Sequence, residues 1–224
     1  MNLTAHELEW LNRRMDWYDI KYQEIYDEIA DHIILAIGRE RSAGDRRTID
    51  IVFDMVAHRE FGGYSGIEKI VKDYERAYRR RIRIALWKNL KSYINFQTMA
   101  WAGILTFIGL YLPHNKQTAI VMFIGLSVTA FVPFVFASRN APQLKTDAGK
   151  QSIVKSFMKT RALALVLLLN FVVNVFGFLA EQWHFEYLKF KNYPPVVYMV
   201  LFSFFIIYGL STIRLCRQEF KIAA

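Results

Sequence analysis

Four stretches without a formal charge constrain most strongly what this chain can fold into. Each runs for 19 to 24 residues without Asp, Glu, Lys or Arg; they are Ser92 to Asn115, Gln117 to Ser138, Ala162 to Ala180 and Asn192 to Ile213. A helix of about 20 apolar residues crosses the roughly 30 Å hydrocarbon core of a bilayer. The sequence therefore predicts four transmembrane helices at about 94–112, 118–138, 162–181 and 195–213.

The first 90 residues have a different composition, with 16 basic and 16 acidic residues and no long uncharged run. This balance is typical of a soluble domain. We therefore predict an all-α chain with a small cytoplasmic helical domain and a four-helix transmembrane bundle. Its expected parts are a helical domain at 1–75, a basic amphipathic juxtamembrane helix at 76–92 and a transmembrane domain at 93–224.

The basic residues that give the chain its net charge of +9 are concentrated next to the predicted spans. Sixteen basic residues flank the predicted spans on one side, whereas the other side has only Lys116, Lys189 and Lys191. Because basic residues accumulate on the cytoplasmic side, both termini are expected in the cytoplasm. No basic surface interleaved with aromatic residues occurs outside the spans, so we expect anionic lipid, and not nucleic acid, to be the partner of these charges.

The juxtamembrane helix is expected to lie along the membrane surface or to continue into the first span. Its apolar residues, among them Ile82 and Leu86, would face acyl chains, and its basic residues would contact lipid headgroups. The predicted headgroup contacts are Arg79, Arg80, Arg81, Arg83 and Lys88.

Start and stop signals divide the soluble part into four helices. Thr4 and Glu7 form a capping box, Asp16 can cap a second helix, and Gly62 with Gly63 ends a third. A fourth helix then has no break signal before Tyr93.

The segment EIYDEIADHI, residues 24–33, raises the question of a metal or acid/base site. At helical spacing Glu24, Asp27 and Asp31 lie opposite the apolar stripe and are expected in solvent. Glu28 and His32 lie at its flank, where they can form a structural pair or a titratable switch. A metal site there would need ligands from another helix, and the candidates Asp54 and His58 point away from it, so we predict no bound metal.

A second polar cluster lies in the third span, where Asn170, Asn174 and Glu181 share one face. Polar groups in hydrocarbon require partners, so this face is expected to turn into the bundle. It is interpreted either as interhelical hydrogen bonding or as the wall of a transport path.

No known catalytic motif is found, and we predict neither an enzyme nor a cofactor. An enzyme of this sequence would have an activity sensitive to His184 or Glu186 on the outer side.

The soluble part resembles the permease prefix domain and the related HAAS signalling domain of bacterial membrane proteins. The resemblance covers roughly residues 5–80 and rests on Glu28, Asp31 and His32 before Ile33, a turn glycine at Gly44, and a helix that ends in Phe61-Gly62-Gly63. It implies a cytoplasmic regulatory or interaction module in the bacterial cytoplasmic membrane, without catalytic residues. The membrane part, which has four predicted spans and no large outer domain, differs from the permease pattern.

The expected function is therefore that of a multi-pass regulatory or scaffolding protein that binds a protein partner or a second copy of itself. The alternative is a small transporter or channel component, or a permease subunit, that uses the polar face of the third span.

Overall fold

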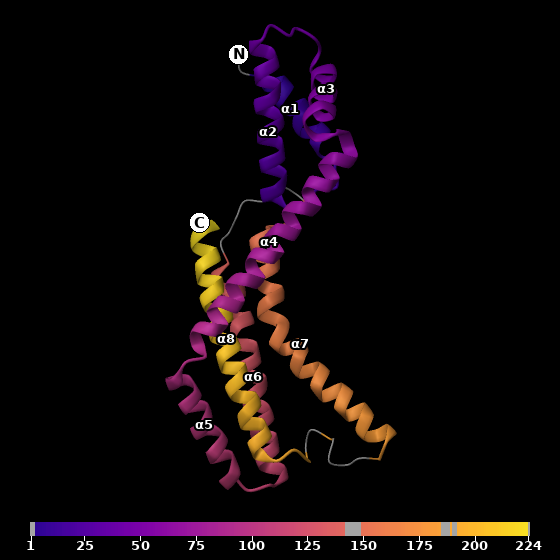
Figure 1. The fold of residues 1–224 in the computed structure, drawn as a ribbon. Coiled ribbons are helices and arrows are strands. Elements are labelled where there is room, and N and C mark those ends of the chain that lie inside the picture. Colours follow the sequence, from indigo (N-terminus) through magenta and orange to yellow (C-terminus); the bar gives the residue numbers. More distant parts are fainter. Residues whose placement is uncertain (1–2, 142–148, 185–188, 190–191, 224) are drawn as a thin grey trace. The chain divides into compact units, whose positions relative to one another are not determined.

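The computed structural model describes residues 3–141, 149–184, 189 and 192–223, and these are almost entirely helical, with no strand among them (Figure 1). In chain order the helices are α1 (Ala5–Met15), α2 (Gln23–Ser42), α3 (Ile49–Phe61), α4 (Gly63–Tyr93), α5 (Phe96–Tyr111), α6 (Lys116–Asn140), α7 (Ile153–Gln182) and α8 (Pro195–Ala223).

The chain divides into two compact units. Unit 1 comprises Met1–Arg81 together with Leu144–Ile153, and unit 2 comprises Ile82–Gln143 together with Val154–Ala224. The division falls inside the uninterrupted helix α4, and the expected absence of a break before Tyr93 is confirmed. The predicted boundaries at 75 and 92 stay predictions. The inclusion of a segment just before α7 in unit 1 was not expected from the sequence.

Two helix ends of unit 1 show the capping interactions that were predicted from the sequence. Thr4 and Glu7 form the predicted capping box at the start of α1. Gly62 ends α3 with a φ of 73°, in the left-handed region that favours glycine. The predicted role of Asp16 is wrong, because Asp16 is the C-cap of α1 and α2 begins only at Gln23. The core of this unit is formed by buried apolar residues of all four helices, including Leu11, Met15, Ile29, Ile33, Ile37, Val52, Phe53, Val56 and Ile67.

Unit 2 is held together by apolar contacts among its long helices. Its central cluster consists of Ala119, Leu126, Ala130, Leu165, Leu169, Tyr198 and Phe205, from α6, α7 and α8. The helix α5 approaches α8 at Gly109, where an added Cβ would lie 2.9 Å from the Val196 Cα. Only glycine fits there, so the two backbones can approach closely.

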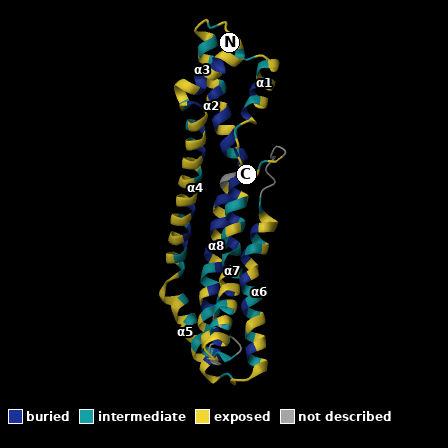
Figure 2. Cartoon of the chain, turned by 90° about the vertical axis from the view of Figure 1, so that its right-hand side faces the viewer, coloured by how far each residue is buried: buried dark blue, intermediate teal, exposed yellow. Residues whose placement is uncertain are grey.

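Three helices of this unit are long and apolar enough to cross a membrane, namely α6, α7 and α8. Between 18% and 33% of the residues in their most apolar windows are buried, and Figure 2 shows exposed residues along these helices. Such exposed apolar surface is expected of helices that contact lipid. The helix predicted as the first span, α5, is apolar but has only 16 residues, or about 24 Å at 1.5 Å per residue.

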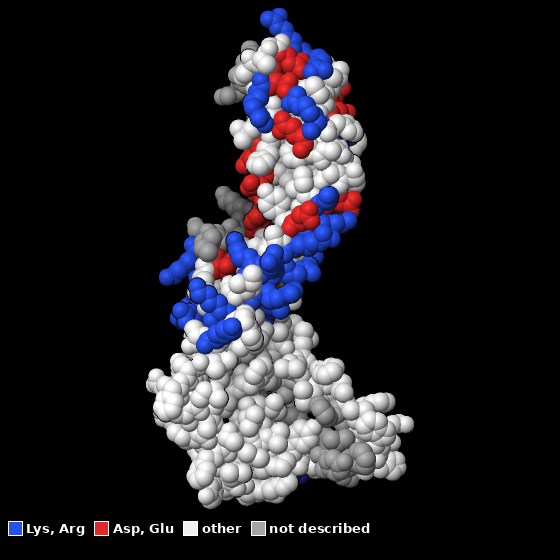
Figure 3. Space-filling model, viewed as in Figure 1, with Lys and Arg blue, Asp and Glu red and all other residues white. Residues whose placement is uncertain are grey.

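Basic side chains of unit 2 gather at one end of its helices, and the rest of the unit 2 surface in this view is largely uncharged (Figure 3). The five predicted headgroup residues Arg79, Arg80, Arg81, Arg83 and Lys88 are all exposed on α4. The prediction for the apolar side of this helix is wrong at Ile82 and Leu86, because both are buried by protein. The amide of Asn89 on the same side donates to Gln218 on α8 at 2.9 Å, so this face of α4 packs on α8 and does not face acyl chains.

Candidate functional site

A large cavity of unit 1 lies where α1 meets α2. It has a volume of about 1010 Å³, and its lining includes the four acidic residues Asp16, Asp19, Asp27 and Asp31. The chain between the two helices is fixed by the buried residues Ile20 and Tyr22, so the cavity has a defined wall. We call it the α1–α2 pocket. Burial raises the pKa of the Tyr18 phenol in its wall, so this phenol is neutral near pH 7.

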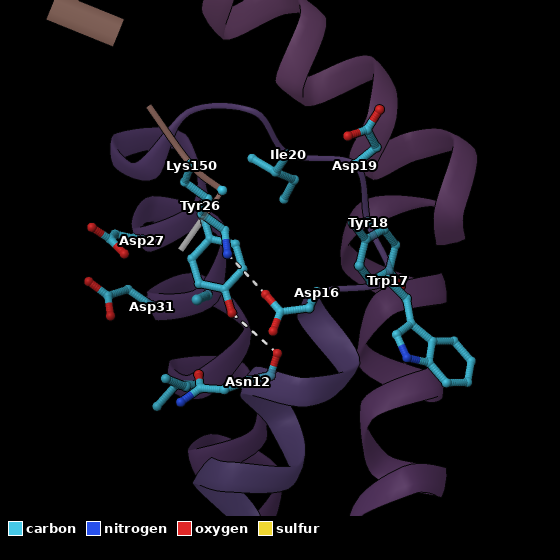
Figure 4. A pocket seen from close by; sticks show the side chains of 13 residues that line it. Asn12, Asp16, Trp17, Tyr18, Asp19, Ile20, Tyr26, Asp27, Asp31 and Lys150 are labelled. Atoms are coloured by element: carbon cyan, nitrogen blue, oxygen red, sulfur yellow. Dashed lines mark hydrogen bonds and ion pairs between the residues drawn. The ribbon is translucent and has the colours of Figure 1, made fainter. Parts of the chain in front are cut away.

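One ammonium group of the chain itself occupies the α1–α2 pocket. The Lys150 Nζ lies 2.9 Å from Asp16 Oδ1 and 4.0 Å from the centre of the Tyr26 ring. Figure 4 shows Lys150 between these two side chains, with the Tyr26 hydroxyl donating to the Asn12 carbonyl at 3.3 Å. The Lys150 side chain is only 13% exposed. The Asp16 carboxylate and the face of the Tyr26 ring together form a binding site for a primary ammonium group.

The next residues along the chain attach to the same part of unit 1 through their backbone. Gln151 accepts a hydrogen bond from the Gln23 amide and donates one to the Lys21 carbonyl, both at 3.0 Å. This is a single parallel bridge between Tyr22 and Gln151. Since backbone hydrogen bonds do not depend on side-chain identity, these two bonds could not be predicted from the sequence.

Glu24 then binds the residues at which α7 begins. Its carboxylate accepts from the Ser152 hydroxyl at 2.6 Å and from the Ile153 amide at 2.9 Å. The first amides of a helix have no partner within the helix, and an anion placed there is favoured by the helix dipole. The prediction that Glu24 is solvated is wrong: it is half-buried, because a segment more than 120 residues away in the sequence covers it.

Residues 150–153 thus form one continuous attachment, which we call the anchor segment. Each of its four residues contacts the end of α1, the α1–α2 connection or the first turn of α2. The contacts of Lys150 and Ser152 and the role of Glu24 were not predicted from the sequence. One available signal was Ser152, a residue type that favours helix N-caps, directly before the apolar run Ile153-Val154.

The predicted pair of Glu28 and His32 does form, with Oε1 and Nε2 3.4 Å apart. Both side chains are more than half exposed, at 53% and 57%, and lie away from the core. Exposed pairs of this kind contribute little to stability. No group of three His, Cys, Asp or Glu able to hold a metal ion occurs among the residues whose placement is described.

Because the pair is exposed, His32→Gln is expected to change the stability of unit 1 by less than about 1 kcal/mol. Ile33→Ala, at the neighbouring and fully buried position, is expected to cost about 2–5 kcal/mol. Hydrogen exchange of the α2 amides in the full-length protein measures both. A loss for His32→Gln as large as that for Ile33→Ala would show that the pair is structural.

The prediction for the third span is wrong in its direction. Asn170, Asn174 and Glu181 are exposed on α7, and do not turn into the bundle. The Asn174 amide instead donates within its own helix, to the Asn170 carbonyl at 2.8 Å and to the Asn170 side-chain oxygen at 3.0 Å. The physical reason is that α7 packs through the opposite face, which carries Leu165 and Leu169. The transport interpretation stays a prediction. Glu186, the acid required for an enzyme, lies outside the described residues.

Over the described residues the chain is almost entirely helical, and three of the helices there are long and apolar enough to cross a membrane. Comparison with known proteins adds no relative, since no protein-family model, curated protein or solved structure matches the chain. The resemblance to permease prefix domains therefore stays a prediction.

Proposed function

We propose that this chain is a multi-pass protein of the bacterial cytoplasmic membrane in which unit 1 is a cytoplasmic regulatory or scaffolding module. Three apolar helices of 25 or more residues support the membrane location. The basic residues at one end of the unit 2 helices support an orientation with both termini inside. With α5 as a short fourth span, the number of crossings is even, as this orientation requires.

The observation that carries the proposal is the anchor segment. These residues belong to unit 1 by their contacts, and the chain continues from Ile153 directly into the long apolar helix α7. A partner that alters the α1–α2 connection would therefore act on the residues that start a membrane helix. Coupling of this kind needs no catalytic group; it requires only that partner binding and anchor docking influence each other.

Glu24→Ala is expected to release the anchor segment. A hydrogen bond to a charged group contributes about 1.5–3 kcal/mol, so exchange protection of the Ile153 amide should fall at least about tenfold. Hydrogen exchange with mass spectrometry on the full-length protein in detergent measures this. Glu28→Ala is the matched control, since Glu28 is an exposed acid on the same helix that does not line the α1–α2 pocket, and it should leave the protection of 150–156 unchanged.

The functional test compares partners of the same two variants. Full-length protein is crosslinked in native membranes and the attached proteins are identified. The proposal expects a specific partner crosslinked to unit 1, with a yield that changes for Glu24→Ala and not for Glu28→Ala. If no protein crosslinks to unit 1, or if both variants behave like the natural chain, the regulatory proposal is wrong.

A further inference from the structure

The outer half of α7 presents one largely exposed stripe, which the described residues of the chain leave uncovered; only its glycine is half-buried. Helical spacing of 3.6 residues per turn puts its members within one arc of the helix surface. They are Leu167, Asn170, Phe171, Asn174, Gly177 and Phe178, and we call them the α7 stripe. Its three large apolar side chains are 58%, 60% and 64% exposed, in chain order. Apart from its neighbours in the chain and the backbone of its own helix, no heavy atom of the described residues lies within 4 Å of the position that a Cβ on Gly177 would take.

The hydrogen-bonding groups of the stripe are only half satisfied. The side-chain nitrogen of Asn174 donates to the two oxygens of Asn170. This leaves the amide hydrogens of Asn170 and the side-chain oxygen of Asn174 without a protein partner among the described residues. In water they would bind solvent. On a helix that crosses hydrocarbon no solvent is present, and each unsatisfied group carries a substantial free-energy penalty.

The unsatisfied groups are complementary to each other. Asn170 offers a donor and Asn174 offers an acceptor, one helical turn apart and on the same face. A lipid chain supplies neither group. A second α7 stripe supplies both at nearly the same depth, and a two-fold axis lets each copy serve the other equally.

We propose that the α7 stripe is the contact through which two copies of this chain associate in the membrane. Gly177 lets the two α7 backbones approach one turn beyond the asparagines, as small residues do at membrane helix contacts. Phe171 and Phe178 flank the polar pair and shield it from lipid. Glu181 lies at the end of the helix, where its carboxylate remains in water.

The experiment uses full-length protein with a single fluorophore, reconstituted at low density into vesicles of phosphatidylcholine and phosphatidylglycerol. Photobleaching steps count the copies in each spot. The natural chain should show two-step spots, and Asn170→Leu with Asn174→Leu should raise the apparent dissociation constant on the order of tenfold. Ser127→Leu removes a hydroxyl from α6 instead, and it should leave the dimer unchanged.

A second measurement distinguishes loss of contact from loss of folding. In a Cys216→Ser background, Asn174→Cys is expected to form an oxidative crosslink between copies, and Val128→Cys, at an exposed position of α6, is not. A monomeric natural chain, a crosslink only at position 128, or a double variant as dimeric as the natural chain would each overturn the proposal. Asparagine-dependent capture of a different membrane protein in place of a second copy would also overturn it.

The inference rests on the proposed membrane location, and the same preparation separates the two. If the protein does not float with the vesicles in a density gradient, the membrane location itself is wrong. If it floats but bleaches in single steps, only the α7 contact is wrong.

Discussion

Gly66→Ala is expected to destabilise unit 1 by at least about 2 kcal/mol. A Cβ built on Gly66 would overlap the Phe61 carbonyl oxygen and would lie 2.6 Å from the carbonyl carbon. Both atoms are backbone at the end of α3, so they can move away only if the α3–α4 connection moves. Overpacking of a rigid site costs about 1–3 kcal/mol or more, which exceeds the roughly 1 kcal/mol that alanine gains over glycine within a helix.

Gly38→Ala is the matched control, because Gly38 lies in the interior of α2 with no atom within 4 Å of an added Cβ. Only the helix propensity acts there, so this variant should be about 0.5–1 kcal/mol more stable than the natural chain. Hydrogen exchange of the unit 1 amides in the full-length protein gives both values. If the two alanine variants shift stability in the same direction, the close approach of α4 to Phe61 is wrong.

Phe53→Ala is expected to cost about 3–5 kcal/mol, because it removes a fully buried ring and leaves a cavity. The ring joins α3 to α1. Its centre lies 5.7 Å from that of Trp10 in an edge-to-face arrangement, and the Arg14 guanidinium lies 5.9 Å above it. Since a small helical domain is stable by only about 5–15 kcal/mol, unit 1 should become largely or partly unfolded.

The control for this variant lies two residues away on the same helix. Ile51 is 48% exposed, so Ile51→Ala should cost less than about 1 kcal/mol. Exchange protection of the α1 amides distinguishes the cases, because the Phe53 ring packs against Trp10 of α1 whereas Ile51 is largely exposed. Equal protection in the two variants would mean that α3 does not pack on α1 through this face.

Gly66 and Phe53 both belong to the helix packing that positions the α1–α2 pocket and the anchor segment. If α1 or the α3–α4 connection moves, the end of α1 moves with it, and Asp16 loses its position relative to Tyr26. Variants of Gly66 and Phe53 should therefore also release Lys150, whereas Glu24→Ala should release residues 152 and 153 without unfolding α1. This difference separates a folding effect from an effect on the coupling itself.

Local signals along the sequence were sufficient to predict the helices. The capping box of Thr4 and Glu7, the glycine that ends α3, and the long uncharged runs each depend on neighbouring residues or on total hydropathy. The Glu28 and His32 pair was likewise predicted because its members are four residues apart on one helix. Whether α5 crosses the membrane depends on more than hydropathy, since its 16 residues are shorter than the bilayer core.

By itself, then, the sequence determined the helical class, the apolar helices and the concentration of basic residues at their ends, because periodicity, capping and hydropathy are local properties of a chain. The tertiary structure alone decided that Glu24 binds Ser152 and Ile153, that Lys150 lies in the α1–α2 pocket, and that Asn170 and Asn174 face outward. A helical wheel shows which residues share a face, but which face is covered depends on contacts between segments far apart in the sequence.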